Sequence, residues 1–391
     1  MADTDLDLDA QTALLYGRLG ARPVINCAGA YTVLGGSQLS PSVRAVMEGA
    51  NHRFADMQAL LESSGRVVAE LLGAEAAYVT AGAAAALTLA AAACLTLEHR
   101  DYLQRLPDTM GIPNQIVVQM SARQKYDRCL ELAGALLVEA GDEHGMTPAQ
   151  LHEAIGPETV AVHYIVPTGA PTDLPGRPPI EDVIEVAHAA GLPVIVDAAG
   201  LTYPVDNLRR FTRLGADLVC YAGKYFDAPQ STGLLVGRRD LIEMAAINGF
   251  VGFETSGYQT IGRPMKVDRQ EVVSCVTALQ EWLELDHEAR FAAYADRIEV
   301  ILAAVADLPG VKASRISAAE TPTPMLRDGV RLHLESPQAA EAAVQGLREG
   351  EPCIWSRQDD LRRDSVNVSV AYLQEGDAEL VARRLREVLG A

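Results

Sequence analysis

Short apolar runs alternate with amphipathic stretches along the first two thirds of the chain. The runs are rich in β-branched residues, which is typical of buried strands, and the stretches between them carry apolar residues at helical spacing. We expect strands at 76–80, 115–119, 135–139, 160–166, 193–197 and 216–221, with helices at 58–72, 84–95, 126–133, 148–155 and 180–190. Strands that alternate with helices pair in parallel, so the pattern predicts an α/β fold with a mostly parallel sheet covered on both faces.

The pattern changes after Gly262. Residues from 267 to about 305 are almost continuously helical in pattern, and short strands at 331–334 and 366–370 then alternate with helices at 338–347 and 378–388. The tail therefore predicts a smaller α/β domain behind a long linking helix. We expect three parts: an N-terminal segment (1–50) that packs on the cleft or the small domain, a large domain (51–265), and the linking helix with the small domain (266–391).

Two helix ends carry explicit local signals. Ser40 followed by Pro41 predicts a helix start, because serine caps the first turn and proline fits it. Gly73 predicts the end of the helix over 58–72, in the left-handed conformation that glycine adopts without strain. Ahead of these signals we expect a helix at 9–19 and an extended segment at 22–29.

Composition and charge narrow the class of protein. The 391 residues include 33 basic and 52 acidic side chains, and the net charge of −19 argues against a nucleic-acid binder or a peripheral membrane protein. Six scattered cysteines without a paired motif fit a reducing compartment and indicate no metal site. The N-terminus lacks the basic and apolar regions of a signal peptide, and the alanine-rich run over 74–97 predicts a strand, a turn and a helix. We expect a cytoplasmic protein without nucleic-acid or membrane partners.

The chain has only four lysines, so chemistry that needs a deprotonated amine has four candidates: Lys125, Lys224, Lys266 and Lys312. Lys224 follows an apolar strand and a glycine, a setting suited to the lowered pKa of a Schiff-base amine. Asp197 closes another apolar strand, where open α/β sheets place their ligands. Either residue alone is as readily a solvated loop side chain. Together they match what pyridoxal phosphate requires, a lysine for the Schiff base and a carboxylate at the pyridine nitrogen.

A third element is the turn of small residues at Gly82, Ala83 and Ala84. It follows a strand and opens a helix, so its backbone N–H groups and the positive end of the helix dipole suit a phosphate. Close packing of the helix on the sheet explains the alanines equally well. The order along the chain, first the turn, then Asp197, then Lys224, favours the phosphate interpretation.

Several blocks around these residues resemble the fold-type I pyridoxal-phosphate enzymes, in particular the selenocysteine synthase-like family and the branch that holds D-glucosaminate-6-phosphate ammonia-lyase. The blocks are Pro23-Val-Ile-Asn26-Cys-Ala-Gly-Ala-Tyr-Thr32, Gly35-Gly-Ser37, Gly73-Ala-Glu-Ala-Ala77, Gly223-Lys224, Pro229-Gln-Ser-Thr-Gly233 and Gly262-Arg-Pro-Met-Lys266-Val. The resemblance implies a large pyridoxal-phosphate-binding domain of the aspartate aminotransferase type, with a central mostly parallel sheet, plus a smaller α/β C-terminal domain.

The resemblance also implies roles for individual residues. Lys224 matches the Schiff-base lysine and Asp197 the carboxylate at the pyridine nitrogen. Gly82, Ala83 and Ala84 match the turn that holds the cofactor phosphate. Thr232, in the stretch Gln230-Ser231-Thr232, matches the segment that reaches a phosphate in such enzymes, across the interface of a homodimer or higher homo-oligomer.

Three positions depart from the pattern of the family. Ala222 stands where relatives often have serine, and Ala228 where they usually have glycine. Ala122 stands where relatives tend to have a histidine near the cofactor ring. The departure at Ala122 leaves the partner that stacks on the ring unidentified.

Carboxylate recognition is expected from arginine, whose planar fork binds a carboxylate through two hydrogen bonds. The first choice is Arg357, because arginines of the tail domain close over substrate in this fold, and Arg123 and Arg263 are second choices. Asn26, in the N-terminal segment, is a weaker candidate. His163 falls within a strand and is expected to be a core or cleft histidine.

These residues suit a reaction that removes the α-proton of a small amino acid or amino sugar acid. We expect β-elimination of the ammonia-lyase type, with Lys224 as the base. Racemisation or epimerisation and β-replacement use the same residues and stay open, and a non-catalytic cofactor-binding protein is a remote alternative. Selenium transfer to a charged tRNA is disfavoured, because a net charge of −19 suits a phosphate backbone poorly.

Overall fold

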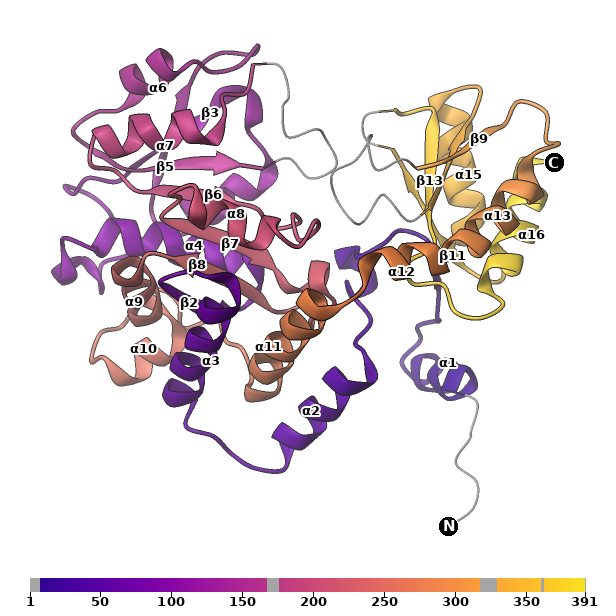
Figure 1. Cartoon of the computed structure of the whole chain (residues 1–391), viewed down its shortest axis with the longest axis horizontal. Helices are drawn as coiled ribbons and strands as arrows, with labels where there is room; N and C mark the ends of the chain where they lie inside the picture. The colour runs from indigo at the N-terminus through magenta and orange to yellow at the C-terminus, as the bar shows by residue number, and fades with distance from the viewer. Residues whose placement is uncertain (1–7, 167–175, 317–328, 360–361, 391) are drawn as a thin grey trace. The chain divides into compact units, whose positions relative to one another are not determined.

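The computed structural model describes residues 8–166, 176–316, 329–359 and 362–390 (Figure 1). The chain divides into two compact units. The larger unit takes Gly35–Leu285, and the smaller one combines the described residues up to Leu34 with those from Asp286 onward. Residues 1–7, part of the segment in which no signal peptide is expected, lie outside the described residues. Within the described ranges no helix is both long and apolar enough to cross a bilayer.

A seven-stranded sheet forms the centre of the larger unit, in the order β2-β8-β7-β6-β5-β3-β4. The strands are β2 (Ala76–Thr80), β3 (Gln115–Gln119), β4 (Leu136–Ala140), β5 (Thr159–Ile165), β6 (Val194–Asp197), β7 (Leu218–Ala222) and β8 (Gly233–Gly237). Strand β8 is antiparallel to both of its neighbours, and β7, β6, β5, β3 and β4 pair in parallel. The expected α/β fold with a mostly parallel sheet is confirmed, and β8 is an additional strand that the sequence pattern did not indicate.

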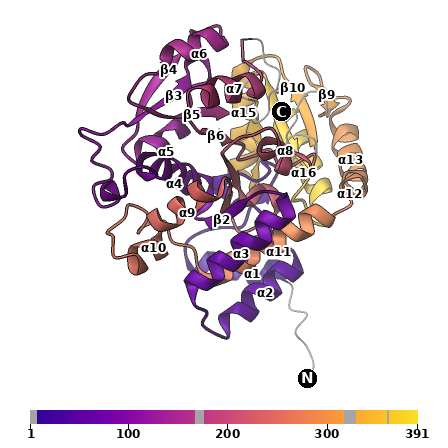
Figure 2. The same cartoon turned by 60° about the vertical axis from the view of Figure 1, so that its left-hand side comes forward.

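Several helices of the larger unit contact the strands of this sheet, and the others pack on those helices (Figure 1). The helices of this unit are α2 (Pro41–Asn51), α3 (Met57–Leu72), α4 (Gly82–Thr96), α5 (Arg128–Glu131), α6 (Pro148–Ala154), α7 (Ile180–Ala189), α8 (Asn207–Arg213), α9 (Arg239–Asn248), α10 (Phe250–Thr255) and α11 (Arg269–Glu284). Helix α11 lies beside α3 and α2 (Figure 2). Helix α4 is buried from Ala85 to Thr96, so its alanines let it pack closely on the sheet and on α9.

The two helix-end signals are confirmed. The Ser40 hydroxyl accepts a hydrogen bond from the Val43 N–H at 3.2 Å, with Pro41 as the first residue of α2. Gly73 adopts a left-handed conformation, with φ at 66°, directly after α3. These contacts satisfy backbone groups that a helix end leaves without partners.

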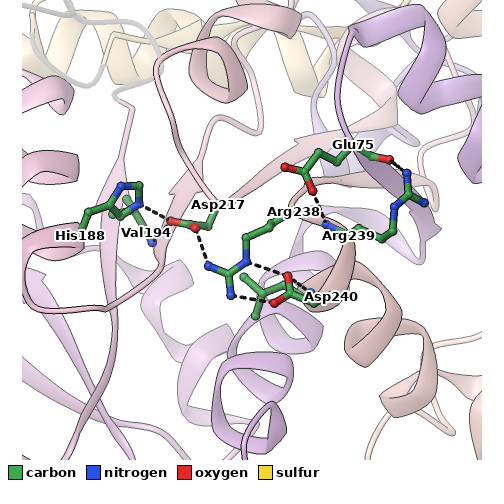
Figure 3. A network of polar contacts seen from close by, with 8 residues as sticks. Glu75, His188, Val194, Asp217, Arg238, Arg239 and Asp240 are labelled. Carbon is green, nitrogen blue, oxygen red and sulfur yellow. Dashed lines mark hydrogen bonds and ion pairs between the residues drawn. The ribbon is translucent and has the colours of Figure 1, made fainter.

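A network of hydrogen bonds and ion pairs around Asp217 stabilises the end of the sheet at which β6 and β7 begin (Figure 3). The Asp217 carboxylate is buried, accepts a hydrogen bond from the Val194 N–H at 2.8 Å and lies 2.9 Å from the His188 Nε2. Its other oxygen accepts from Arg238 at 2.9 Å, and Arg238 also binds Asp240. This network lies at the amino ends of β6 and β7, so it holds the sheet together away from the ends where ligands bind in such folds.

The smaller unit contains a four-stranded antiparallel sheet in the order β12-β13-β10-β9 and a parallel pair of β1 with β11. Its strands are β1 (Ile25–Asn26), β9 (Lys312–Arg315), β10 (Gly329–His333), β11 (Ile354–Trp355), β12 (Arg357–Gln358) and β13 (Ser365–Ser369). Its helices are α1 (Leu8–Arg18), α12 (His287–Ala293), α13 (Ala295–Val305), α15 (Pro337–Glu349) and α16 (Asp377–Leu389). Helices α13, α15 and α16 pack with this sheet around one apolar core, which confirms the smaller α/β domain.

The almost continuously helical stretch expected from 267 to about 305 is present, but the single long linking helix is wrong, because three helices, α11, α12 and α13, occupy this stretch. Leu285 has extended backbone, with ψ at 134°, and ends α11. Asp286 then caps α12, since its carboxylate accepts from the Ala289 N–H at 2.9 Å. A short acidic side chain that binds backbone N–H groups favours a new helix start over a continued helix.

Candidate active site

The strand register brings the predicted cofactor residues to one edge of the large sheet. Gly233 at the start of β8 pairs with Thr80 at the end of β2 and with Ala222 at the end of β7. In the neighbouring pair, Asp197 at the end of β6 lies opposite Cys220. Lys224 follows β7 by two residues, and α4 begins two residues after β2. The turn over 82–84, Asp197 and Lys224 therefore share the edge where the parallel strands end.

The Asp197 carboxylate is buried, with 6% of the residue exposed. One oxygen accepts from the Ala199 N–H at 3.1 Å and the other from the Gln124 side-chain amide at 3.3 Å. Burial, together with a smaller effect of the nearby Asp127 carboxylate, raises the pKa of Asp197 to about 6, against the effect of these two hydrogen bonds. A cationic partner would favour the charged form, which is what a protonated pyridine nitrogen offers.

Lys224 lies in a tight 3₁₀ turn, Gly223–Phe226, directly after β7. The side chain is half-buried, and its Nζ lies 5.0 Å from the centre of the Tyr225 ring. The preceding residue must be glycine, because a Cβ at Gly223 would fall 2.2 Å from the Thr232 hydroxyl oxygen. The close contact between Gly223 and Thr232 fixes the start of the turn that carries the lysine.

The turn before α4 fits an anionic group. Gly82 has φ at 80°, and the capping residue Ala81 makes no side-chain hydrogen bond to the first N–H groups of the helix. Ala84 is exposed, so the turn opens to the surface of the unit. Uncapped N–H groups at a helix start bind phosphate through hydrogen bonds and the helix dipole. With the buried carboxylate and the lysine at the same edge, these residues fit pyridoxal phosphate.

Thr232 is fully buried. Its hydroxyl donates to the Pro229 carbonyl at 2.8 Å, and the Gly223 N–H donates to the Thr232 carbonyl, also at 2.8 Å. These bonds shape the loop between Lys224 and β8. A contact of Thr232 with a cofactor phosphate stays a prediction.

The two second-choice arginines bind carboxylates within the larger unit. Arg123 lies 2.6 Å from Asp127 and also pairs with Glu139, and Arg263 lies 2.9 Å from Glu254. These ion pairs compete with any substrate carboxylate for the same guanidinium groups.

The other two candidates for substrate binding, Asn26 and Arg357, belong to the smaller unit. The Asn26 amide donates to the Gly29 carbonyl at 3.1 Å and accepts from the Ala28 N–H at 2.8 Å, so it stabilises a local turn. Arg357 is half-buried on β12, and its guanidinium lies 4.8 Å from the centre of the Tyr31 ring. Arg263 also lies over an aromatic ring, 5.7 Å from the centre of Phe253, and the closer contact of Arg357 with Tyr31 orients its planar fork.

Three residues near the edge were not assigned to the site from sequence. Gln124 contacts Asp197 directly. Asp127 is buried, and its carboxylate accepts a hydrogen bond from the Gln124 N–H at 3.0 Å. The ring of His163 on β5 is buried, makes no hydrogen bond within the described residues, and has a pKa lowered by burial to about 4. Gln124 and Asp127 follow the end of a parallel strand, and that position was the available signal.

Comparison with known proteins agrees with this geometry. Residues 37–315 match the family model of the class-V aminotransferases. The chain is 30% identical to D-glucosaminate-6-phosphate ammonia lyase of Salmonella typhimurium, covering 96% of this chain and 98% of that protein. A solved structure of a D-glucosaminate-6-phosphate ammonia-lyase is 29% identical and aligns with a TM-score of 0.81 over 96% of this chain and 98% of its own.

Two further relatives carry other activities in their names. A 5'-C-glycyluridine monooxygenase-decarboxylase of a Streptomyces species is 31% identical over 96% of this chain and 92% of its own length. An L-seryl-tRNA(Sec) selenium transferase of Moorella thermoacetica is 26% identical over 95% of this chain and 83% of its own length. Both relatives match nearly the whole chain, which confirms the resemblance to the selenocysteine synthase-like group. With a lysine, a buried carboxylate and an uncapped helix start at one sheet edge, the chain belongs to the class-V aminotransferase family of fold-type I, pyridoxal-phosphate-dependent enzymes.

Proposed function

We propose that this enzyme removes the α-proton of a small amino acid or amino sugar acid and expels a group from the β-carbon, as an ammonia-lyase does. The observation that carries the proposal is the placement of Asp197 and Lys224 at the ends of neighbouring strands β6 and β7, beside the turn that opens α4. The name of the relative that matches 96% of this chain supports the elimination.

Each residue of the site has a defined task in this proposal. When bound, pyridoxal phosphate withdraws electrons from the α-carbon of the substrate and so makes its proton acidic. Lys224 would hold the cofactor through its Nζ, and its amine, when free, would accept the α-proton at the same atom. Asp197 keeps a proton on the pyridine nitrogen, and the N–H groups of Gly82, Ala83 and Ala84 bind the phosphate.

Arg357 is the residue proposed for the substrate carboxylate. Its stacking on Tyr31 holds the guanidinium plane. An arginine held in this way loses little side-chain freedom when it binds a carboxylate through two hydrogen bonds.

A second candidate reaction is loss of the substrate carboxylate. The 31% identity with a protein named as a monooxygenase-decarboxylase supports it as well as 30% supports the lyase. Racemisation and β-replacement also rely on Lys224 and Asp197. The identity of the products separates these reactions.

The test combines spectroscopy with product analysis. The purified protein should bind pyridoxal phosphate with a visible absorption band that disappears in Lys224→Ala, and an unchanged band in that variant would refute the role of Lys224. The loaded enzyme is then incubated with candidate amino acids and amino sugar acids in deuterated water. Ammonia with a ketoacid product supports elimination. Deuterium in recovered substrate without release of ammonia, or release of carbon dioxide, would overturn it in favour of racemisation or decarboxylation.

A further inference from the structure

Hydrogen bonds hold the segment over 123–127 so that the Gln124 side chain points at the Asp197 carboxylate. It follows β3 at the same sheet edge as Asp197, although 73 residues separate Gln124 from Asp197 along the chain. The Gln124 side-chain amide donates to the Asp197 Oδ2 at 3.3 Å. Among the described residues this contact is the one side-chain hydrogen bond to Asp197, since the other carboxylate oxygen is bound by the backbone of Ala199.

Asp127 holds the backbone of Gln124 in place. Its Oδ2 accepts from the Gln124 N–H at 3.0 Å and from the Arg123 Nε at 2.6 Å, and the Asp127 N–H donates back to the Gln124 carbonyl at 3.1 Å. Only 2% of Asp127 is exposed, so this clamp is buried. Arg123 is further tied to Glu139 on β4. The main chain at Gln124 is therefore fixed to the sheet rather than free to follow a ligand.

We propose that Gln124 is a positioning residue for Asp197, orienting the carboxylate toward the pyridine nitrogen. The inference rests on the proposed cofactor role of Asp197. A charged carboxylate accepts about four hydrogen bonds, so the bonds from Gln124 and Ala199 leave capacity for the ring nitrogen. An amide donor also favours the charged form of a carboxylate that burial disfavours.

The decisive experiment is a double-mutant cycle on cofactor affinity. The variants are Gln124→Leu, Asp197→Asn and the double variant, with Ser121→Ala as a control at an exposed position two residues before this segment. Removing a donor to a charged group should weaken pyridoxal-phosphate binding of the apoprotein about tenfold in the wild-type background. In the Asp197→Asn background the same change should weaken cofactor binding less than about twofold, because Gln124 acts through Asp197. An equal loss in both backgrounds, or no loss in either, would overturn the inference.

A second measurement keeps the test decisive if Asp197→Asn binds too weakly to titrate. The variant Gln124→Glu places a carboxylate against Asp197, so its cofactor affinity should fall further as the pH rises from about 5 to about 8, whereas Gln124→Leu should show a weaker trend. Parallel curves for the two variants would overturn the inference. If the wild-type protein takes up no pyridoxal phosphate, the proposed function fails instead, and that outcome is separate from an unchanged affinity in Gln124→Leu.

Discussion

Gly233 lies directly against the peptide that joins Gly82 to Ala83. A Cβ at Gly233 would fall 2.5 Å from the Gly82 carbonyl carbon and 2.8 Å from the Ala83 nitrogen. Both contacts are with backbone, which cannot turn aside as a flexible side chain can. The first residue of β8 therefore sets the position of the turn proposed to bind the cofactor phosphate.

Replacing Gly233 by alanine should displace this turn. We expect Gly233→Ala to lower the free energy of unfolding by about 1–3 kcal/mol, the usual cost of overpacking, and to weaken pyridoxal-phosphate binding. Urea unfolding of the apoprotein and titration with the cofactor measure the two effects. Gly156→Ala is the matched control, because nothing lies within 4 Å of its added Cβ. Equal stability and affinity in the two variants would contradict the close packing at Gly233.

The buried carboxylate of Asp197 should make the apoprotein less stable at neutral pH than at mildly acidic pH. Its pKa is raised from 3.8 to about 6, so the folded state binds the proton more tightly than the unfolded state and stability falls as the pH rises through this window. Relative to Asp197→Asn, the wild type should lose about 1–2 kcal/mol of unfolding free energy between about pH 5 and about pH 8. Urea unfolding of both apoproteins measures this difference. A difference that does not change with pH would mean that Asp197 is not buried as described.

His163 should produce the opposite trend. Its pKa is lowered from 6.5 to about 4 by burial, so the unfolded state binds the proton more tightly and stability rises with pH. Relative to His163→Leu, the wild type should gain about 2 kcal/mol between about pH 5 and about pH 8. The register places His163 opposite Ile195 and Asp197 opposite Ile165, so both groups lie on one face of the sheet. The difference in unfolding free energy between wild type and His163→Leu should thus change with pH in the opposite direction to the difference between wild type and Asp197→Asn. A change in the same direction would refute the neutral state of the histidine.

Arg357 should affect substrate binding and leave the cofactor unchanged. We expect Arg357→Gln to raise KM about 10- to 100-fold, the loss of a charge-assisted pair of hydrogen bonds, with the cofactor spectrum as in wild type. Arg357→Lys should recover part of the affinity, because it keeps the charge but not the planar fork. Arg315→Gln serves as the control, since Arg315 is an exposed arginine of the same unit. An unchanged KM in Arg357→Gln would remove this residue from the proposed site.

Asp197 and Lys224 were identifiable because both follow apolar strands, and the sheet brings such positions together. Gln124 was not, since its contact with Asp197 depends on the order of β3, β5 and β6 in the sheet, which the strand pattern alone does not give. Strand β8 was missed because Gly233-Leu-Leu-Val-Gly237 is bounded by glycines and holds a single β-branched residue, whereas the predicted strands were chosen for their β-branched content. The break between α11 and α12 was missed because it depends on local capping by Asp286, within a stretch whose periodicity is strongly helical.

The pairing of β2 with β8 also bears on the order in which the protein acquires its structure during synthesis. Strand β2 ends at Thr80 and its one partner in the sheet begins at Gly233, 153 residues later. Closing so long a loop is slow compared with forming local helices. A nascent chain that stops short of Gly233 therefore carries an unpaired apolar strand, and the segments on either side of the phosphate turn become neighbours only when β8 has left the ribosome.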